Sequence, residues 1–186
     1  MTNIDIPIIN EELLKLYSPL TLNADITDFY PYILLAQELY IKPIIGEALL
    51  IELKEQIKEN DLTEDNSALI IKIAPVLALY TCYQGLPFLW ARLEAKGLTV
   101  KSSENSESIE MKDLNQLRLF LKNDAEAFQL TLIEFLCKCK SSYPLWQPDN
   151  ESCCNQFEKN EFGSASPKFD SGIFFKNKPN NCGCGC

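Results

Sequence analysis

Apolar and polar positions alternate with the period of amphipathic helices through most of the central part of the chain. A first helix is predicted to begin near Asn23 or Asp25, because either side chain can cap a helix, and Pro43 is predicted to end this helix or to start the next. A second is predicted over residues 44–59, with Gly46 permitting a close helix crossing early in it. The apolar positions of this second helix recur at every fourth residue: Ile45, Leu49, Leu53 and Ile57.

The third predicted helix, over residues 67–95, is apolar nearly all round. A helix without a polar face has to be surrounded by other elements, so we expect it at the centre of a bundle. Pro75 and Pro87 are predicted to kink or interrupt it, and Gly97 to mark its end. Residues 73–91 carry no charge, which raises the alternative of a membrane span. The prolines and the lack of flanking basic anchors favour a buried core helix.

A fourth helix, predicted over residues 109–140, has the clearest pattern in the chain. Its apolar positions step by three and four: Met111, Leu114, Leu117, Leu121, Ala125, Phe128, Leu132 and Phe135. At about 1.5 Å per residue it would span roughly 45 Å, so we expect it to project beyond the core and contact neighbours. Before it, residues 98–101 are β-like and the polar run 102–108 is predicted to be an exposed loop.

These patterns divide the chain into three regions. Residues 1–23 are predicted to be an N-terminal arm with one short amphipathic piece at 11–17, residues 24–141 a helical core domain, and residues 142–186 an extended C-terminal arm. The predicted fold class is mainly α. We expect a helical bundle with one long projecting helix, a short β-like loop and the extended C-terminal arm.

The charge balance restricts the function. The formal net charge is −9 and histidine is absent. Phosphate binding relies on Lys and Arg, so this balance argues against a protein that coats DNA or lies on a membrane, while allowing a channel wall past which DNA slides. Without histidine, Ser-His-Asp and Cys-His arrangements are impossible within this chain. With no glycine-rich phosphate loop either, we predict a non-enzymatic protein with no catalytic residues and no cofactor.

Eight cysteines stand at positions 82, 137, 139, 153, 154, 182, 184 and 186. Their Cys-x-Cys spacing differs from the Cys-x2-Cys knuckle typical of zinc sites. A disulfide framework needs an oxidising compartment, and residues 1–9 show no secretory signal. Reduced thiols, with Cys82 as a small core residue, are therefore favoured over metal binding and over disulfides. The sequence leaves all three interpretations open, and no cysteine is assigned as a metal ligand.

The C-terminal arm carries large apolar residues although it has no helical period. A polar disordered tail would lack such residues, so we expect them to lie in grooves, either of their own bundle or of a neighbouring subunit. Residues 173–175 are a credible short strand for addition to another sheet. The candidate partner-binding residues are Tyr143, Trp146, Phe157, Phe162, Phe169, Ile173, Phe174 and Phe175.

The stretch from Ile33 to Gly46, ILLAQELYIKPIIG, resembles the first helical motif of small proteins encoded beside capsid and portal genes in phages of Bacteroidetes hosts, crAss-like phages included. The long helix that ends in residues 142–146, SYPLW, is similar too, as is a tail with Cys154 and a strand at 173–175. Further similar positions are Tyr80, Tyr83, Gly85 and Leu86. The resemblance covers most of the chain and consists mainly of packing motifs.

This resemblance implies a head-completion or adaptor protein, a subunit of the head-to-tail connector of a tailed phage. Such connectors form dodecameric rings below the portal, pass DNA through their lumen and join the capsid vertex to the tail. Their termini embrace adjacent subunits or the portal. The implied partners are other copies, the portal and tail-ring proteins, without a membrane, and the implied place is the neck of the virion after assembly in the host cytoplasm. No catalytic residue is carried over.

Two other functions are compatible with the same residues. One is a metal-binding regulatory or redox module that uses the clustered thiols, which elemental analysis with thiol counting would discriminate. The other is an acidic helical binding module of a cellular host, which the neighbouring genes would discriminate.

Overall fold

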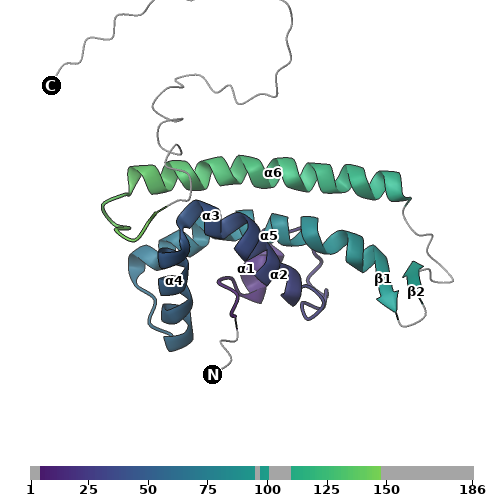
Figure 1. The fold of residues 1–186 in the computed structure, drawn as a ribbon, viewed down its shortest axis with the longest axis horizontal. Helices are drawn as coiled ribbons and strands as arrows, with labels where there is room; N and C mark the ends of the chain where they lie inside the picture. Colours follow the sequence, from purple (N-terminus) through teal and green to yellow (C-terminus); the bar gives the residue numbers. More distant parts are fainter. Residues whose placement is uncertain (1–4, 95–96, 101–109, 148–186) are drawn as a thin grey trace, which may run out of the picture.

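The computed structural model describes residues 5–94, 97–100 and 110–147. This part of the chain is mainly helical, as predicted, and Figure 1 shows its elements. They are α1 (Glu11–Leu16), α2 (Tyr30–Ala36), the π-helical turn η1 (Gln37–Ile41), α3 (Lys42–Ile45), α4 (Glu47–Glu59), α5 (Glu64–Trp90), β1 (Ala91–Glu94), β2 (Gly97–Val100) and α6 (Met111–Lys138). The loop predicted over residues 102–108 lies outside the described residues.

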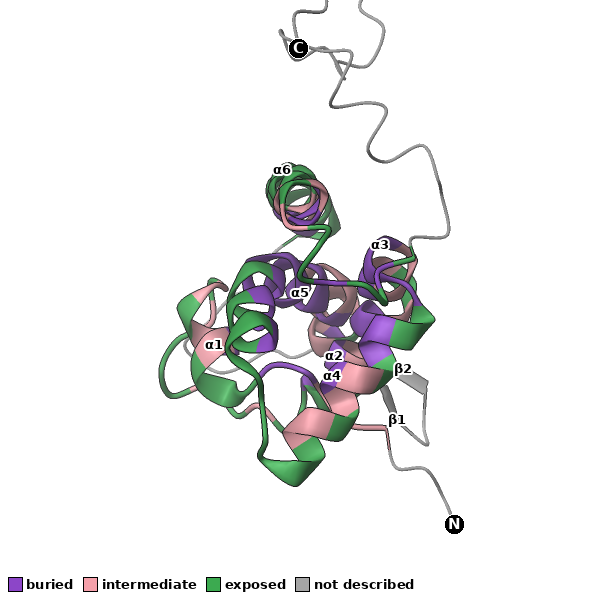
Figure 2. Ribbon diagram, turned by 90° about the vertical axis from the view of Figure 1, so that its left-hand side faces the viewer, coloured by how far each residue is buried: buried purple, intermediate pink, exposed green. Residues whose placement is uncertain are grey.

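Helix α5 is the centre of the bundle. It packs against α1, α2, η1 and α6, and Figure 2 shows it between α6 and the smaller helices, with much of its surface buried. By length and composition α5 could cross a membrane, but 72% of its most apolar window is buried inside the protein. Its hydropathy is therefore accounted for by its neighbours, because a helix that is apolar all round needs partners on every side.

The ends of α5 differ from the prediction. Thr63 caps the first turn by accepting a hydrogen bond from the Asn66 N–H at 3.2 Å. The predicted continuation to residue 95 is wrong, because the chain leaves the helix after Trp90 and forms β1. This strand pairs antiparallel with β2, which covers most of the segment predicted to be β-like.

Both prolines lie inside α5, so the helix is interrupted at neither of them, and the predicted alternative of a kink stays a prediction. A helical proline leaves the carbonyl four residues earlier without its N–H donor. For Pro87 that carbonyl belongs to Tyr83, and Nε of Arg118 donates to it at 3.1 Å from α6. A side chain that is distant in the sequence thus replaces the missing hydrogen bond.

The first two predicted helices are also divided differently. The helix that begins at Tyr30 widens into η1 and continues as α3, where Pro43 occupies the first turn and needs no N–H. Pro43 thus starts a helical segment, which is one of the two predicted alternatives, although that segment continues the preceding helix. The break comes at Gly46, whose φ of +83° and ψ of 158° lie where residues with a side chain are strained.

The N-terminal residues belong to the core. Ile8, Ile9 and Leu14 are buried in the same apolar cluster as α5. The buried side chain of Gln37 accepts a hydrogen bond from the Ile8 N–H at 3.0 Å and donates one to the Ile6 carbonyl at 3.3 Å. The core thus extends well before residue 24, where composition placed its beginning.

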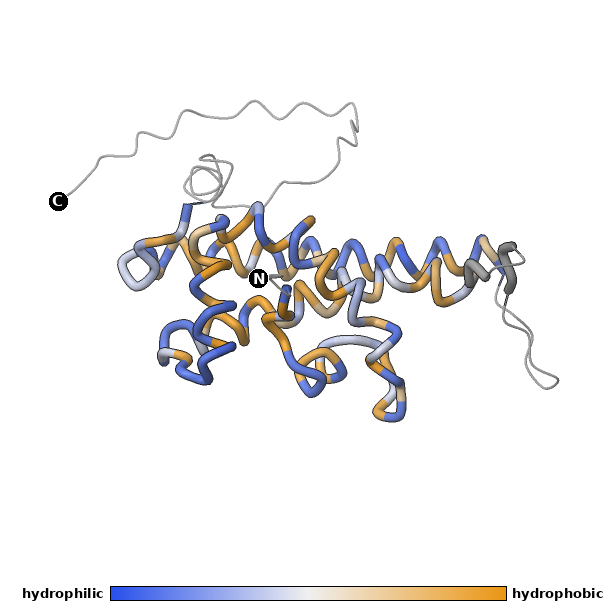
Figure 3. Tube along the Cα trace, turned by 60° about the horizontal axis from the view of Figure 1, so that its bottom comes forward, coloured by the Kyte–Doolittle hydropathy of each residue, from blue (hydrophilic) through white to orange (hydrophobic). Residues whose placement is uncertain are grey.

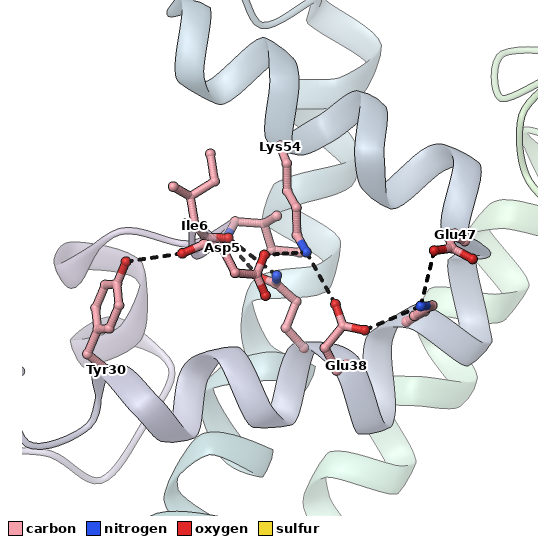
Figure 4. A network of polar contacts seen from close by, with 9 residues as sticks. Asp5, Ile6, Tyr30, Glu38, Glu47 and Lys54 are labelled. Atoms are coloured by element: carbon pink, nitrogen blue, oxygen red, sulfur yellow. Dashed lines mark hydrogen bonds and ion pairs between the residues drawn. The ribbon is translucent and has the colours of Figure 1, made fainter. Parts of the chain in front are cut away.

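An ionic network ties the same segment to the helices (Figure 4). Nζ of Lys54 on α4 lies 2.6 Å from a carboxylate oxygen of Asp5 and 3.2 Å from one of Glu38. Nζ of Lys42 bridges Glu38 and Glu47, at 3.4 Å from each. These pairs are partly exposed, so we expect them to fix the direction of the segment more than to add stability.

The chain turns back after α6 and forms what we call the C-terminal clasp, residues 143–147. Tyr143 is 3% exposed and its hydroxyl donates to the Asp65 carbonyl at 2.7 Å. Trp146 is 5% exposed and its indole N–H donates to the Ile44 carbonyl at 2.9 Å. A Cβ on Gly46 would meet the backbone carbonyl of Gln147, with the carbonyl carbon only 2.9 Å away. The core therefore also extends beyond residue 141, where the C-terminal arm was predicted to start.

Candidate protein-binding surface

Helix α6 is supported mainly on one side. Its main packing partner among the described elements is α5, and Figure 2 shows α6 lying on α5 with its outer side uncovered. Polar and apolar residues alternate along its length (Figure 3). Its buried residues form one stripe: Leu114, Leu121, Ala125, Leu132, Ile133 and Leu136. Among the residues that the structure describes, no other element has its main contacts with the rest of the helix circumference.

A tyrosine cluster fixes α6 in place. The ring of Tyr80 on α5 stacks on that of Tyr40 in η1, with centroids 3.8 Å apart and planes 3° from parallel. The Tyr80 hydroxyl donates to Oε1 of Gln129 on α6 at 3.0 Å. Nε2 of Gln84 donates to the Tyr40 hydroxyl at 2.6 Å. The π-helical turn, α5 and α6 are thereby joined through one set of side chains.

Arg118 makes the second attachment of α6. Its guanidinium lies 4.5 Å from the centre of the Tyr83 ring and also bonds the Tyr83 carbonyl that Pro87 leaves without a donor. A stacked guanidinium with a hydrogen bond is a more directional contact than a surface ion pair. The helix is therefore held at a fixed rotation about its own axis, which determines which side chains face outward.

Burial raises the pKa of the Tyr80 phenol to about 12 and raises that of Tyr40 above its ordinary value. Both rings are therefore uncharged at neutral pH. An uncharged phenol that is stacked and hydrogen-bonded within the protein is suited to holding elements together, and poorly suited to acting as a base or nucleophile.

The outward side of α6 carries an apolar surface, which we call the α6 flank: Leu117, Phe120, Asp124 and Phe128. These residues step by three, four and four, so they share one face of the helix. The exposed fractions of Leu117, Phe120 and Phe128 are 39%, 56% and 45%. Single exposed apolar residues are common on proteins, but two phenylalanines and a leucine on one face mark a surface suited to binding another protein.

A second surface lies across α5 from α6. Here residues 6–10, α1, α4 and the start of α5 line an open apolar groove. Its lining includes the exposed residues Leu62 and Ile71, and Lys58 is the one charged residue among the described residues that line it. Figure 1 shows α1 and α4 on the side of α5 opposite to α6. We call this surface the N-terminal groove.

The candidate residues predicted from the sequence have two outcomes. Tyr143 and Trp146 lie in the C-terminal clasp and contact their own chain, which is the intramolecular alternative left open above. The remaining six lie outside the described residues and stay predictions: Phe157, Phe162, Phe169, Ile173, Phe174 and Phe175.

The sequence prediction missed the α6 flank. It placed Leu117 and Phe128 in one apolar series with Leu114, Leu121 and Leu132, whereas the structure buries these three and exposes Leu117 and Phe128, as it does Met111. The signal that could have revealed the flank was Phe120, together with Leu119 and Leu130. All three are apolar but lie off the stripe, so α6 has more apolar positions than one partner helix can cover.

No metal centre is found in the described part of the chain. Within residues 5–94, 97–100 and 110–147, no three His, Cys, Asp or Glu side chains are grouped closely enough to hold an ion. Cys82 is buried, and burial raises the pKa of its thiol to about 11, so it is protonated and inert at neutral pH. The cysteines at positions 153, 154, 182, 184 and 186 lie outside the described residues.

Comparison with known proteins identifies one family. A family model described as a family of unknown function, DUF6712, matches residues 41–156, which is more than half of the chain. The match spans α3 to the C-terminal clasp, including α5, α6 and the tyrosine cluster except for Tyr40. No curated protein matches the chain, and no solved structure matches it.

Proposed function

This chain belongs to the DUF6712 family of unknown function, and we propose that it is a virion structural protein, a subunit of the head-to-tail connector ring of a tailed phage. In this role it joins the portal to tail proteins around the DNA channel. The support is the resemblance of residues 33–46 and 142–146 to connector proteins, together with an outward surface suited to protein contacts.

The α6 flank is the observation that carries this proposal. Aromatic residues, phenylalanine included, are enriched at the buried cores of protein interfaces. Here two of them stand on a helix that is fixed by Arg118 and Tyr80, and both are exposed in the part of the chain that the structure describes. A surface held in place before binding loses little entropy when it is covered, which favours a permanent assembly.

The proposal also includes two finer features of the fold. Helix α6 acts as the projecting element of the subunit, presenting the α6 flank to a neighbour. The C-terminal clasp then fixes where the extended arm begins, next to Ile44 and Asp65. From there, residues 148–186 bring their six aromatic or aliphatic candidates to an adjacent subunit or to the portal.

The charge of the chain fits a place beside DNA without tight binding. With a net charge of −9, a channel wall built from this protein would not hold phosphates strongly, so DNA could slide past it. The proposed location is the neck of the virion after assembly in the host cytoplasm. A dodecameric ring is the stoichiometry that the resemblance implies.

The test is a measurement of molar mass in solution. The purified full chain, analysed by size-exclusion chromatography with light scattering, is expected to self-associate or to form a stable complex when mixed with portal. Phe120→Ser should weaken that association by about 2 kcal/mol, roughly 30-fold in Kd, because it removes an aromatic anchor.

Leu119→Ser is the matched control. Leu119 is about as exposed as its neighbour Phe120 but lies about 100° round the helix, off the α6 flank. It should leave association unchanged. A chain that binds neither itself, nor portal, nor tail proteins would refute the proposed function, and equal effects of the two variants would refute the assignment of the α6 flank.

A further inference from the structure

We infer that the α6 flank of one copy docks in the N-terminal groove of a second copy, with Asp124 of the first facing Lys58 of the second. This inference rests on the proposed self-assembly and deepens it by naming the two surfaces that meet.

The two surfaces lie on opposite sides of the subunit. Helix α6 covers one side of α5, and α1 and α4 lie on the other (Figures 1 and 2). A protein with two different binding surfaces associates head to tail, and such contacts close into a ring when the rotation between neighbours allows it. Because each surface contacts a different neighbour, one copy can be bound on both sides at once.

The two surfaces have complementary character. The α6 flank is an apolar ridge with a single carboxylate, Asp124, between Phe120 and Phe128. The groove is apolar, with Ile57 and Ile71 among its lining residues and one ammonium group, that of Lys58. Asp124 and Lys58 are both exposed, and neither forms an ion pair with another residue that the structure describes. Docking would give each charge a partner inside an otherwise apolar contact.

Pairing of two α6 flanks is less favourable. Asp124 lies near the middle of the flank, so two copies related by a twofold axis would bring two like charges together between apolar residues. Like charges opposed within an interface are costly. The same argument disfavours two grooves facing one another, since each contributes only Lys58. Electrostatics thus selects the contact between different surfaces.

Charge reversal in the full-length chain tests the inference. Asp124→Lys and Lys58→Glu should each raise the Kd for self-association at least about tenfold, because each places like charges together. Mixing the two single variants should restore assembly. When the two variants alternate in the assembly, each contact between position 124 of one copy and position 58 of the next joins opposite charges. Half of the contacts have the original pair of charges and half have the reversed pair. The double variant alone should assemble for the same reason.

Asn123→Lys is the control, because it adds a positive charge to an exposed neighbouring position that lies off the flank, and it should leave the Kd unchanged. Far-ultraviolet circular dichroism of each variant establishes that it is folded. If the wild-type chain assembles while the single variants do so equally well, or if mixing them restores nothing, the inference is wrong and the proposed function stands. A wild-type chain that remains monomeric at all concentrations also overturns the inference, and binding to portal then decides the proposed function separately.

Discussion

Replacement of Trp146 by phenylalanine tests whether the C-terminal clasp is part of the core. The indole N–H donates to the Ile44 carbonyl at 2.9 Å, and both residues are buried. Ile44 stands in α3, which ends one residue later, so its carbonyl is one of those that a helix end leaves without a backbone donor. Phenylalanine preserves an aromatic ring in the site but has no N–H to offer.

The expected loss of stability follows from two contributions. A buried acceptor left without its donor costs about 1–3 kcal/mol. The smaller ring also leaves unfilled volume, which costs on the order of 1 kcal/mol. Together these predict that the free energy of unfolding falls by roughly 2–4 kcal/mol, which lowers the Tm of a chain of this size by about 5–15 °C.

Urea unfolding followed by far-ultraviolet circular dichroism, at matched protein concentration, measures this change. Tyr143→Phe removes only the hydroxyl that bonds the Asp65 carbonyl and should cost about 1 kcal/mol. Leu145→Ala is the control, because Leu145 lies between the two anchors but is exposed, and it should change stability by less than about 0.5 kcal/mol. A Trp146→Phe variant as stable as the Leu145→Ala variant would show that the clasp does not pack on the bundle.

Three further predictions concern single groups. Gly46→Ala should destabilise the chain by roughly 2–4 kcal/mol in the same urea assay, because its φ is +83° and a methyl group would collide with the Gln147 backbone. Cys82, whose thiol pKa is raised to about 11 by burial, should react with a thiol reagent at neutral pH only as fast as the protein unfolds, a rate that mass spectrometry of the labelled peptide can follow. The contribution of Tyr80 to the free energy of unfolding should not change with pH below pH 10. It should be lost as the pH rises from 10.0 to about 12, because the phenol ionises more readily in the unfolded chain than in the folded one. A Tyr80→Phe variant whose stability declines equally steeply over this range would contradict the prediction.

The sequence was most informative where the pattern is local. The period of three and four located α6, and the lack of a polar face placed α5 at the centre, because these features depend only on neighbouring residues. The packing of Ile8 and Ile9 could not be predicted in this way. It depends on Gln37, which follows nearly thirty residues later and supplies hydrogen bonds to the backbone of that segment.

The effect of the prolines was predicted only in part, for a similar reason. Pro43 was expected to end one helix or to start the next, and it lies in the first turn of α3. Pro87 was expected to kink or interrupt α5, but the helix continues past it and Arg118 replaces the lost hydrogen bond. Gly46 was recognised as a position of close approach. What approaches it, however, is the backbone of Gln147 and not another helix. Such compensation between distant segments leaves no periodic signal in the sequence.

The candidate site shows a similar limit. The sequence predicted that large apolar residues in the C-terminal arm bind protein, either in their own bundle or in a neighbouring subunit. Two of those anchors, Tyr143 and Trp146, are used by the chain's own core. The apolar series predicted for α6 did not distinguish the exposed residues Leu117 and Phe128 from the buried ones, because spacing alone does not show how many partners a helix has.

The most direct test of the central claim, that the α6 flank binds another subunit, is sedimentation equilibrium of the wild-type chain beside Phe120→Ser and Leu119→Ser. We predict that wild type and Leu119→Ser form the same oligomer and that Phe120→Ser dissociates at roughly 30-fold higher concentration. Identical masses for all three proteins at every concentration would contradict the claim.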